Sequence, residues 1–230
     1  MLNKVKGGLI VSCQALPDEP LYSSFIMSRL AKAAFEGGAL GIRANTPQDV
    51  KAIKQVVDLP VVGIIKRDYQ DSNVYITPTI NEVMELRDSN PEMIAMDATF
   101  ETRPNGESLA SIMTYMKSHC PEVQTMADIA TLEQAIEAEK LGFDCVSTTL
   151  RGYTEETQGL RNDDNDFEFV RQLVETLSIP VIAEGNIDTP EKAARCLNLG
   201  CHAIVVGGAI TRPKQITEKF IQAMSSTETL

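Results

Sequence analysis

Short apolar segments recur along the chain at regular intervals. Each contains three to six residues and is rich in valine, isoleucine, alanine and methionine. Apolar runs of this length, bounded by polar or turn-forming residues, are typical of strands buried on both faces of a parallel sheet. Eight such runs are present, at 8–13, 40–44, 61–65, 93–96, 123–127, 145–149, 181–183 and 203–206. The pattern therefore predicts eight strands.

The segments between these strands carry apolar residues three and four positions apart, the spacing of an amphipathic helix. The clearest examples lie at 25–33, 50–57, 132–139 and 167–177. Pro60 and Pro180 stand directly before two strands, where a helix must already have ended. Thr46 and Thr189 each precede a proline, which predicts a capping residue followed by the first helical position. Thr131 is expected to cap a further helix.

Eight alternating strand–helix units are compatible with a closed barrel or with a doubly wound sheet. A dinucleotide-binding sheet requires a glycine fingerprint after its first strand, and here Cys13 is followed by Gln14 and Ala15. The sequence therefore predicts a single (β/α)8 TIM barrel. The length of 230 residues is within the range of that fold, so we expect one domain over 1–230, with a flexible tail at about 225–230.

Polar residues stand where the predicted strands end. In this fold the carboxyl ends of the strands carry the chemistry. A ring that contains two cations and three carboxylates is hard to explain as packing, because buried unpaired charge is costly. In chain order the residues at the strand ends are Gln14, Arg43, Lys66, Asp97, Asp128, Thr148, Glu184 and the pair Gly207 and Gly208.

The turns after the last two strands predict a phosphate site, which makes the expected barrel one of the phosphate-binding type. Glycine lets backbone N–H groups approach an anion closely, and a short helix at 209–211 would direct its free N–H groups toward the same place. The loops after strands seven and eight hold phosphate in many barrels of this kind. The predicted phosphate-binding residues are Gly185, Asn186, Gly207, Gly208 and Arg212.

Charge and cysteine content narrow the class of protein further. The net charge of −11 argues against a nucleic-acid partner, and no apolar segment approaches the ~20 residues of a membrane span. Five cysteines without CxxC spacing indicate reduced thiols in a cytoplasmic protein. The only histidines, His119 and His202, form no cluster, so we expect no metal site, although Asp97 and Asp128 leave one open.

Several strand-end motifs together resemble those of the N-acetylmannosamine-6-phosphate 2-epimerase family. The resemblance extends from the first strand to the last helix. It is carried by GLIVSCQALPDEPL at 8–21, GIRAN at 41–45, IIKRDY at 64–69, ADIAT at 127–131, TTLRGYT at 148–154, AEGN at 183–186 and VVGGAITRP at 205–213.

The resemblance implies an epimerase of amino-sugar (sialic acid) catabolism. Such an enzyme interconverts N-acetylmannosamine 6-phosphate and N-acetylglucosamine 6-phosphate through deprotonation and reprotonation at C2, without a cofactor. It implies Lys66 as the catalytic base and Glu184 as a second catalytic residue. The implied contacts to the sugar come from Gln14, Arg43, Asp128, Thr148 and Tyr153.

Two other functions remain open at this point. Another phosphate-binding barrel, such as a different sugar-phosphate isomerase or epimerase, would share the glycine loops. Metal-dependent pentose-phosphate epimerisation would be expected to use histidines at strand ends, and this chain has none there. A non-catalytic phosphosugar-binding regulator would not need Lys66 and Glu184 together. A homodimer is compatible with the fold, but no segment of the sequence identifies an interface.

Overall fold

The computed structural model describes residues 1–225 and contains a closed barrel of eight parallel strands. Each strand pairs with the next in the sequence, and the eighth pairs with the first. The strands are β1 (Leu9–Cys13), β2 (Gly41–Asn45), β3 (Val61–Ile64), β4 (Met93–Asp97), β5 (Gln124–Asp128), β6 (Cys145–Ser147), β7 (Val181–Glu184) and β8 (Ala203–Val206). The predicted (β/α)8 fold is confirmed.

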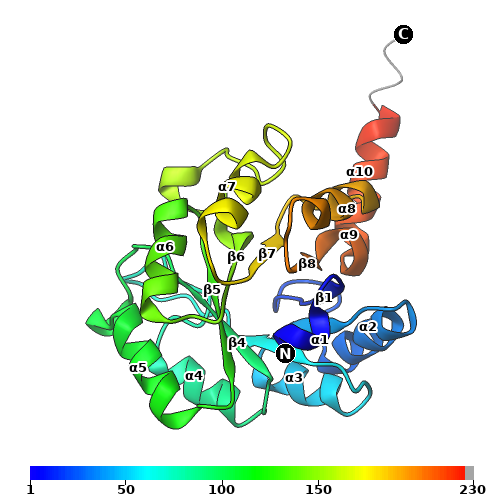
Figure 1. Ribbon diagram of the computed structural model, residues 1–230. Coiled ribbons are helices and arrows are strands. Elements are labelled where there is room, and N and C mark those ends of the chain that lie inside the picture. The colour runs from blue at the N-terminus through cyan, green and yellow to red at the C-terminus, as the bar shows by residue number, and fades with distance from the viewer. Residues whose placement is uncertain (226–230) are drawn as a thin grey trace.

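Helices surround the strands (Figure 1). The ring is formed by α2 (Ser24–Glu36), α3 (Pro47–Lys54), α4 (Ile80–Arg87), α5 (Leu109–His119), α6 (Leu132–Leu141), α7 (Glu168–Thr176) and α8 (Pro190–Asn198). Short additional helices are α1 (Leu2–Val5), α9 (Gly208–Thr211) and the 3-10 turns η1 (Pro104–Gly106), η2 (Thr148–Leu150) and η3 (Glu155–Thr157). The expected short helix after the eighth strand is therefore present as α9.

The predicted capping residues begin three of these helices. The hydroxyl of Thr46 accepts a hydrogen bond from the backbone of α3, and Thr189 does the same for α8. Thr131 forms a reciprocal capping box with Gln134 at the start of α6. These bonds satisfy N–H groups that have no partner within the helix, so each cap fixes where its helix starts.

Alternating residues of each strand point into the barrel. Apolar residues fill its interior, including Ile10, Val62, Met126, Cys145 and Ile182. Because side chains in a strand alternate between its two faces, residues two positions further along the same strand also face inward. This periodicity carries inward-facing positions from the apolar interior to the polar mouth at the carboxyl ends of the strands.

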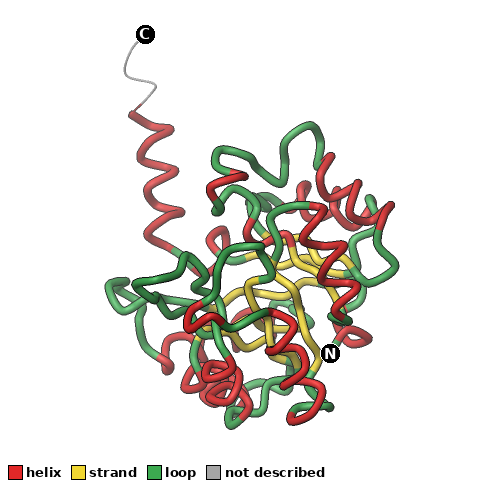
Figure 2. The backbone as a smooth tube through the Cα atoms, turned by 90° about the vertical axis from the view of Figure 1, so that its left-hand side faces the viewer, coloured by secondary structure: helices red, strands yellow, loops and turns green. Residues whose placement is uncertain are grey.

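The last helix, α10 (Pro213–Ser225), departs from the ring. None of its residues is buried, and it projects away from the barrel in both backbone views (Figures 1 and 2). Apart from Ser225, which ends α10, the flexible tail expected at about 225–230 lies outside the described residues.

Candidate active site

A cavity of about 1020 Å³ opens at the carboxyl end of the barrel. Ten of the twelve residues predicted for the site line it: Gln14, Arg43, Lys66, Tyr153, Glu184, Gly185, Asn186, Gly207, Gly208 and Arg212. Asp128 and Thr148 are not among the lining residues. The barrel therefore brings most of the predicted set to one place, while the role of each residue stays a prediction.

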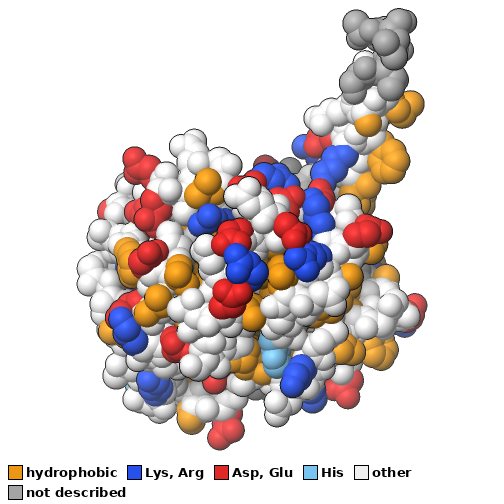
Figure 3. Space-filling view, turned by 45° about the horizontal axis from the view of Figure 1, so that its top comes forward, with side chains coloured by type: hydrophobic (Ala, Val, Ile, Leu, Met, Phe, Trp, Pro, Cys, Tyr) orange, Lys and Arg blue, Asp and Glu red, His pale blue; other side chains and the backbone are white. Residues whose placement is uncertain are grey.

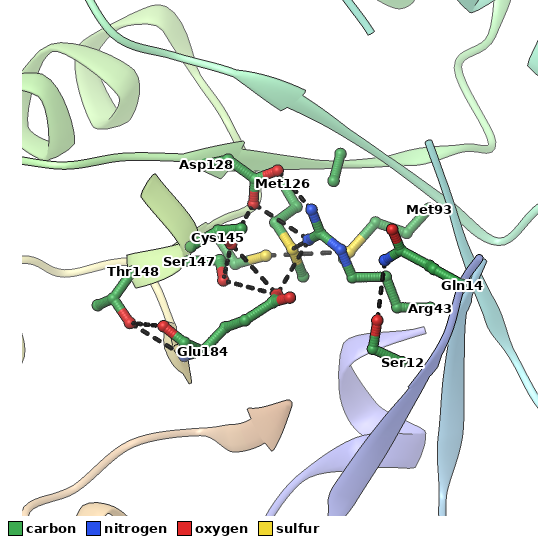
Figure 4. Close-up of polar contacts among 12 residues, drawn as sticks. Ser12, Gln14, Arg43, Met93, Met126, Asp128, Cys145, Ser147, Thr148 and Glu184 are labelled. Carbon is green, nitrogen blue, oxygen red and sulfur yellow. Dashed lines mark hydrogen bonds and ion pairs between the residues drawn. The ribbon is translucent and has the colours of Figure 1, made fainter. Parts of the chain in front are cut away.

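Arg43 is the centre of a buried charge network (Figure 4). Its guanidinium donates two hydrogen bonds to Asp128, with Nη1–Oδ1 at 3.1 Å and Nη2–Oδ2 at 2.6 Å. Nη1 also lies 3.2 Å from Oε2 of Glu184. Although burial opposes the charged guanidinium, the two carboxylates raise the pKa of Arg43 above its ordinary value. Arg43 is therefore a fixed positive charge in the floor of the cavity.

Lys66 follows β3, and its side chain is partly buried at the cavity wall. Its backbone N–H donates to the side chain of Asn45 at 2.9 Å, which fixes the start of the loop. Burial lowers the pKa of Lys66, and the positive charges of Arg43 and Arg212 lower it further, against the opposing effect of Glu184 and Asp128. The environment therefore shifts Lys66 toward the neutral amine, the form that a general base requires.

Glu184 ends β7, and its side chain is 14% exposed. Burial raises the pKa of Glu184; the charge of Arg43 opposes this change, and the charge of Asp128 adds to it. Lysine and glutamate are thus both shifted toward their neutral forms in one cavity. Titratable groups with such shifts are typical of catalytic sites, because an acid and a base must both act near neutral pH.

Thr148 was predicted to contact the sugar, and the structure places its side chain against the backbone of β7. Its hydroxyl donates to the carbonyl of Glu184 at 2.8 Å and accepts from the N–H of Glu184 at 2.9 Å (Figure 4). Through these two bonds, the side chain of Thr148 holds the end of β7. Thr149, the next residue, lines the cavity instead and donates to Asp128 at 2.6 Å.

Asp128, also predicted to contact the sugar, lies behind Arg43. Its side chain is 0% exposed, and its oxygens accept from Arg43 and Thr149. Asp128 therefore binds the guanidinium of Arg43 and does not line the cavity. Two other predicted contacts differ in their surroundings: Tyr153 is 72% exposed at the mouth, whereas Gln14 is buried and its Oε1 has no hydrogen-bond partner among residues 1–225.

The loops after β7 and β8 form the other end of the cavity. Gly185 and Asn186 both have positive φ angles, of 95° and 59°. A Cβ added to Gly207 would lie 3.2 Å from Cβ of Ser12, so a side chain there would crowd β1. Arg212 lies at the same end, with Nη1 3.0 Å from Oε1 of Glu19. The main chain here approaches the cavity closely, as an anion site requires.

Asn162 holds this loop and was not predicted. Its Nδ2 lies within hydrogen-bonding distance of the carbonyls of Glu184 at 2.7 Å, Thr148 at 3.1 Å and Gly185 at 3.2 Å. It thereby ties the segment after β6 to the end of β7. Its loop position gives no strand or helix periodicity, so no pattern in the sequence distinguishes it from other loop asparagines.

Residues 1–225 contain no group of three or more histidine, cysteine, aspartate or glutamate side chains arranged to hold a metal ion. The two carboxylates for which a metal was considered are bonded to protein groups instead. Asp97 accepts from the backbone and hydroxyl of Thr99, and Asp128 accepts from Arg43.

Comparison with known proteins agrees with this geometry. Residues 27–226 match the family model described as "Putative N-acetylmannosamine-6-phosphate epimerase". The chain belongs to this family. The resemblance predicted from the strand-end motifs is therefore confirmed.

Relatives in this epimerase family are similar over almost their whole length. A protein of Enterobacter sp. (strain 638), named "Putative N-acetylmannosamine-6-phosphate 2-epimerase", is 60% identical over 226 residues, which cover 98% of this chain and 96% of the relative. A protein of the same name from Oceanobacillus iheyensis is 61% identical over 221 residues, covering 96% and 100%.

Solved structures give the same fold. The N-acetylmannosamine-6-phosphate 2-epimerase from Clostridium perfringens matches with a TM-score of 0.93 and 56% identity, over 97% of this chain and 96% of that one. A thiamine phosphate pyrophosphorylase from Pyrococcus furiosus matches with a TM-score of 0.62 and 20% identity, over 94% and 92%. The second likeness extends to the fold alone.

Thr149 and Tyr75 are among the residues that line the cavity of this epimerase-family chain and were not predicted. Thr149 could have been found from strand periodicity, because Cys145 and Ser147 face inward and Thr149 is next in that alternation. Tyr75 comes from the loop after β3, where regular periodicity does not apply. Burial, with the charges of Asp128 and Asp97, raises the pKa of Tyr75 to about 12, so its phenol stays a neutral hydrogen-bond donor.

Proposed function

We propose that this chain interconverts N-acetylmannosamine 6-phosphate and N-acetylglucosamine 6-phosphate, the activity of an N-acylglucosamine-6-phosphate 2-epimerase in amino-sugar catabolism. One observation carries the proposal: a lysine shifted toward its neutral form shares a cavity with a fixed guanidinium and two glycine-rich loops. The names of the family and its relatives supply the substrate.

In this proposal the phosphate binds at the loops after β7 and β8, and the sugar extends toward Lys66. The Lys66 amine removes the hydrogen from C2 of the open-chain sugar. Arg43 stabilises the negative charge that develops on the neighbouring oxygen, since a cation already held in place needs no reorganisation. Glu184 donates a proton to the substrate, at the ring oxygen as the ring opens or at the face of C2 opposite Lys66.

Isotope exchange is the direct test. In deuterated water, each turnover should place deuterium at C2, because the proton removed exchanges with solvent or is replaced by one derived from it. Proton NMR of the product measures this together with the conversion of one epimer into the other. Conversion without label after full equilibration would exclude the enediolate route, and phosphosugar binding without any conversion would indicate a regulator instead.

A second test removes the proposed base. Lys66→Ala should lower kcat by about 10² to 10⁴, the usual contribution of one general base. Phosphosugar binding should remain measurable by calorimetry, because the phosphate loops lie on other strands. Turnover equal to that of the parent protein would exclude Lys66 as the base.

We further propose that the protein works in the cytoplasm as a homodimer. The five cysteines are free and buried, as expected in a reducing compartment. No helix within residues 1–225 is long and apolar enough to cross a membrane. For the dimer, the support comes from α10, where Phe220 and Ile221 are 67% and 56% exposed on a helix with no buried residue. A second copy of this chain is the occupant that we propose for that face.

A further inference from the structure

Thr149 stands between the carboxylates of Asp128 and Glu184. Its hydroxyl oxygen lies 2.6 Å from Oδ1 of Asp128 and 3.2 Å from Oε2 of Glu184. The hydroxyl of Ser147 lies 2.8 Å from the same oxygen. Thr149 is thus the shortest connection through hydrogen-bonding groups between the carboxylate that supports Arg43 and the one that faces the cavity.

The number of protons on this hydroxyl limits what it can do. A threonine hydroxyl carries one proton and two lone pairs, so it can donate to Asp128 or to Glu184 but not fully to both. When Glu184 is protonated, Thr149 can donate to Asp128, at the shorter of the two distances. When Glu184 is ionised, rotation about the Cβ–Oγ1 bond can bring the same proton to the new carboxylate.

The two carboxylates differ in how well they tolerate losing this bond. Asp128 keeps two donors from Arg43, one on each oxygen. Glu184 has weaker support, because its Oε2 lies 3.2 Å from Arg43 Nη1 and 3.5 Å from the hydroxyl of Ser147. The hydroxyl of Thr149 therefore stabilises an ionised Glu184 more than it stabilises Asp128.

The charges that act most on Glu184 come from three elements. Arg43 on β2 and Lys66 after β3 are positive, whereas Asp128 on β5 is negative. β6 and η2 contribute the hydroxyls described above, and the paired residue on β8 is Val205. Among residues 1–225, the hydroxyls with a hydrogen bond to the carboxylate of Glu184 are those of Thr149, at 3.2 Å, and Ser147, at 3.5 Å.

We propose that Thr149 is a positioning residue that stabilises Glu184 as a carboxylate once it has given its proton to the substrate, by turning its hydroxyl from Asp128 to Glu184. The proposal rests on the proposed function, in which Glu184 is an acid. The proton passes from Glu184 to the substrate, the O–H bond of Thr149 stays intact, and no co-reactant is needed.

Two substitutions separate the hydroxyl from the shape of the side chain. Thr149→Val keeps the branched shape and removes the hydroxyl, whereas Thr149→Ser keeps the hydroxyl. The valine variant should move the limb of the kcat pH profile that belongs to Glu184 about one unit to higher pH, because a hydrogen bond to the ionised form is lost. The serine variant should stay close to the parent protein. Thr149→Ala serves as a second hydroxyl-free variant if valine prevents folding, which circular dichroism checks.

A direct titration makes the result independent of turnover. Carbon NMR of protein labelled at glutamate carboxyls reports the ionisation of Glu184, with Glu184→Gln identifying its signal. If the Glu184 titration moves upward in Thr149→Val while the parent protein fails to epimerise, the proposed function fails and the role of Thr149 stands. If the parent protein epimerises and neither titration nor kcat limb moves, or if Thr149→Ser behaves like Thr149→Val, the role of Thr149 is overturned.

Discussion

Burying the charged side chain of Arg43 is unfavourable in free energy, and this cost explains why a buried carboxylate pairs with it. Its side chain is 1% exposed, and its partner Asp128 is 0% exposed. Taking such a pair out of water costs several kcal/mol per ion, which only good geometry and further hydrogen bonds offset. A hydrophobic pair would serve stability as well. The charge is therefore best explained by the chemistry of the cavity, where it acts on both Lys66 and Glu184.

Arg212 is expected to influence Lys66 as well as the phosphate. Because Arg212 contributes to lowering the pKa of Lys66, Arg212→Gln should let that pKa rise. A base must be neutral to act, so the rising limb of the kcat pH profile should move to higher pH, and the KM should increase as the cation is lost.

Lys219→Gln provides the matched control for this experiment. It also removes a cation from the cavity lining, but Lys219 pairs with Asp188 and is not among the charges that act on Lys66. Its profile should keep the parent limb. An unchanged limb in Arg212→Gln, or an equal shift in both variants, would contradict the expected coupling.

At this scale, strand periodicity explains why four of the predicted side chains reach the cavity. Gln14, Arg43, Lys66 and Glu184 continue the inward alternation of their strands, and all four line the cavity. Thr148 is out of phase with Cys145, so its side chain turns to the backbone of β7. Residues on loops, such as Asn162, follow no such rule, because long-range folding alone places them.

At the scale of elements, the loop after β7 depends on glycine for a stated geometric reason. Gly185 has φ of 95°, and an added Cβ would lie 3.0 Å from Nδ2 of Asn162. Gly185→Ala should thus displace Asn162 and the loop, and raise the KM for the phosphosugar roughly tenfold, the effect of losing one hydrogen bond to a charged group.

Gly159→Ala is the control for backbone strain alone. Gly159 also has a positive φ, of 81°, but an added Cβ would meet nothing within 4 Å. Both variants should lose about 1–2 kcal/mol of unfolding free energy, as expected for a side chain in the left-handed region. Only Gly185→Ala should change the KM. Equal KM values in the two variants would show that the loop tolerates the substitution.

The elements themselves were largely predictable, since all eight strands and the capped helices follow from local patterns. The predicted strand at 145–149 was too long at its end, because β6 stops at Ser147 and the chain turns into η2. The direction of α10 was not predictable. Its sequence has the same helical spacing of apolar residues as the other helices. Whether that apolar face packs against the barrel or projects from it depends on the packing of the whole chain.

At the scale of the whole molecule, the projection of α10 from the barrel leaves apolar side chains exposed to water. Association with a second chain would remove this unfavourable exposure. The hydrophobic side chains of α10 lie on the column that projects from the body (Figure 3). Exposed apolar surface commonly marks an interaction site, and identical chains most often associate as two-fold dimers. A partner of the same chain would bury Phe220 and Ile221 on both helices at once.

Phe220→Glu tests this association. Light scattering coupled to size exclusion should show a dimer mass for the parent protein at micromolar concentration and a monomer mass for the variant, because a charge cannot be buried in an apolar contact without a partner. Phe100→Glu is the control, since that ring is 64% exposed on the loop after β4 and should leave the dimer intact. A monomeric parent protein, or a dimer that survives Phe220→Glu, would exclude α10 as the interface.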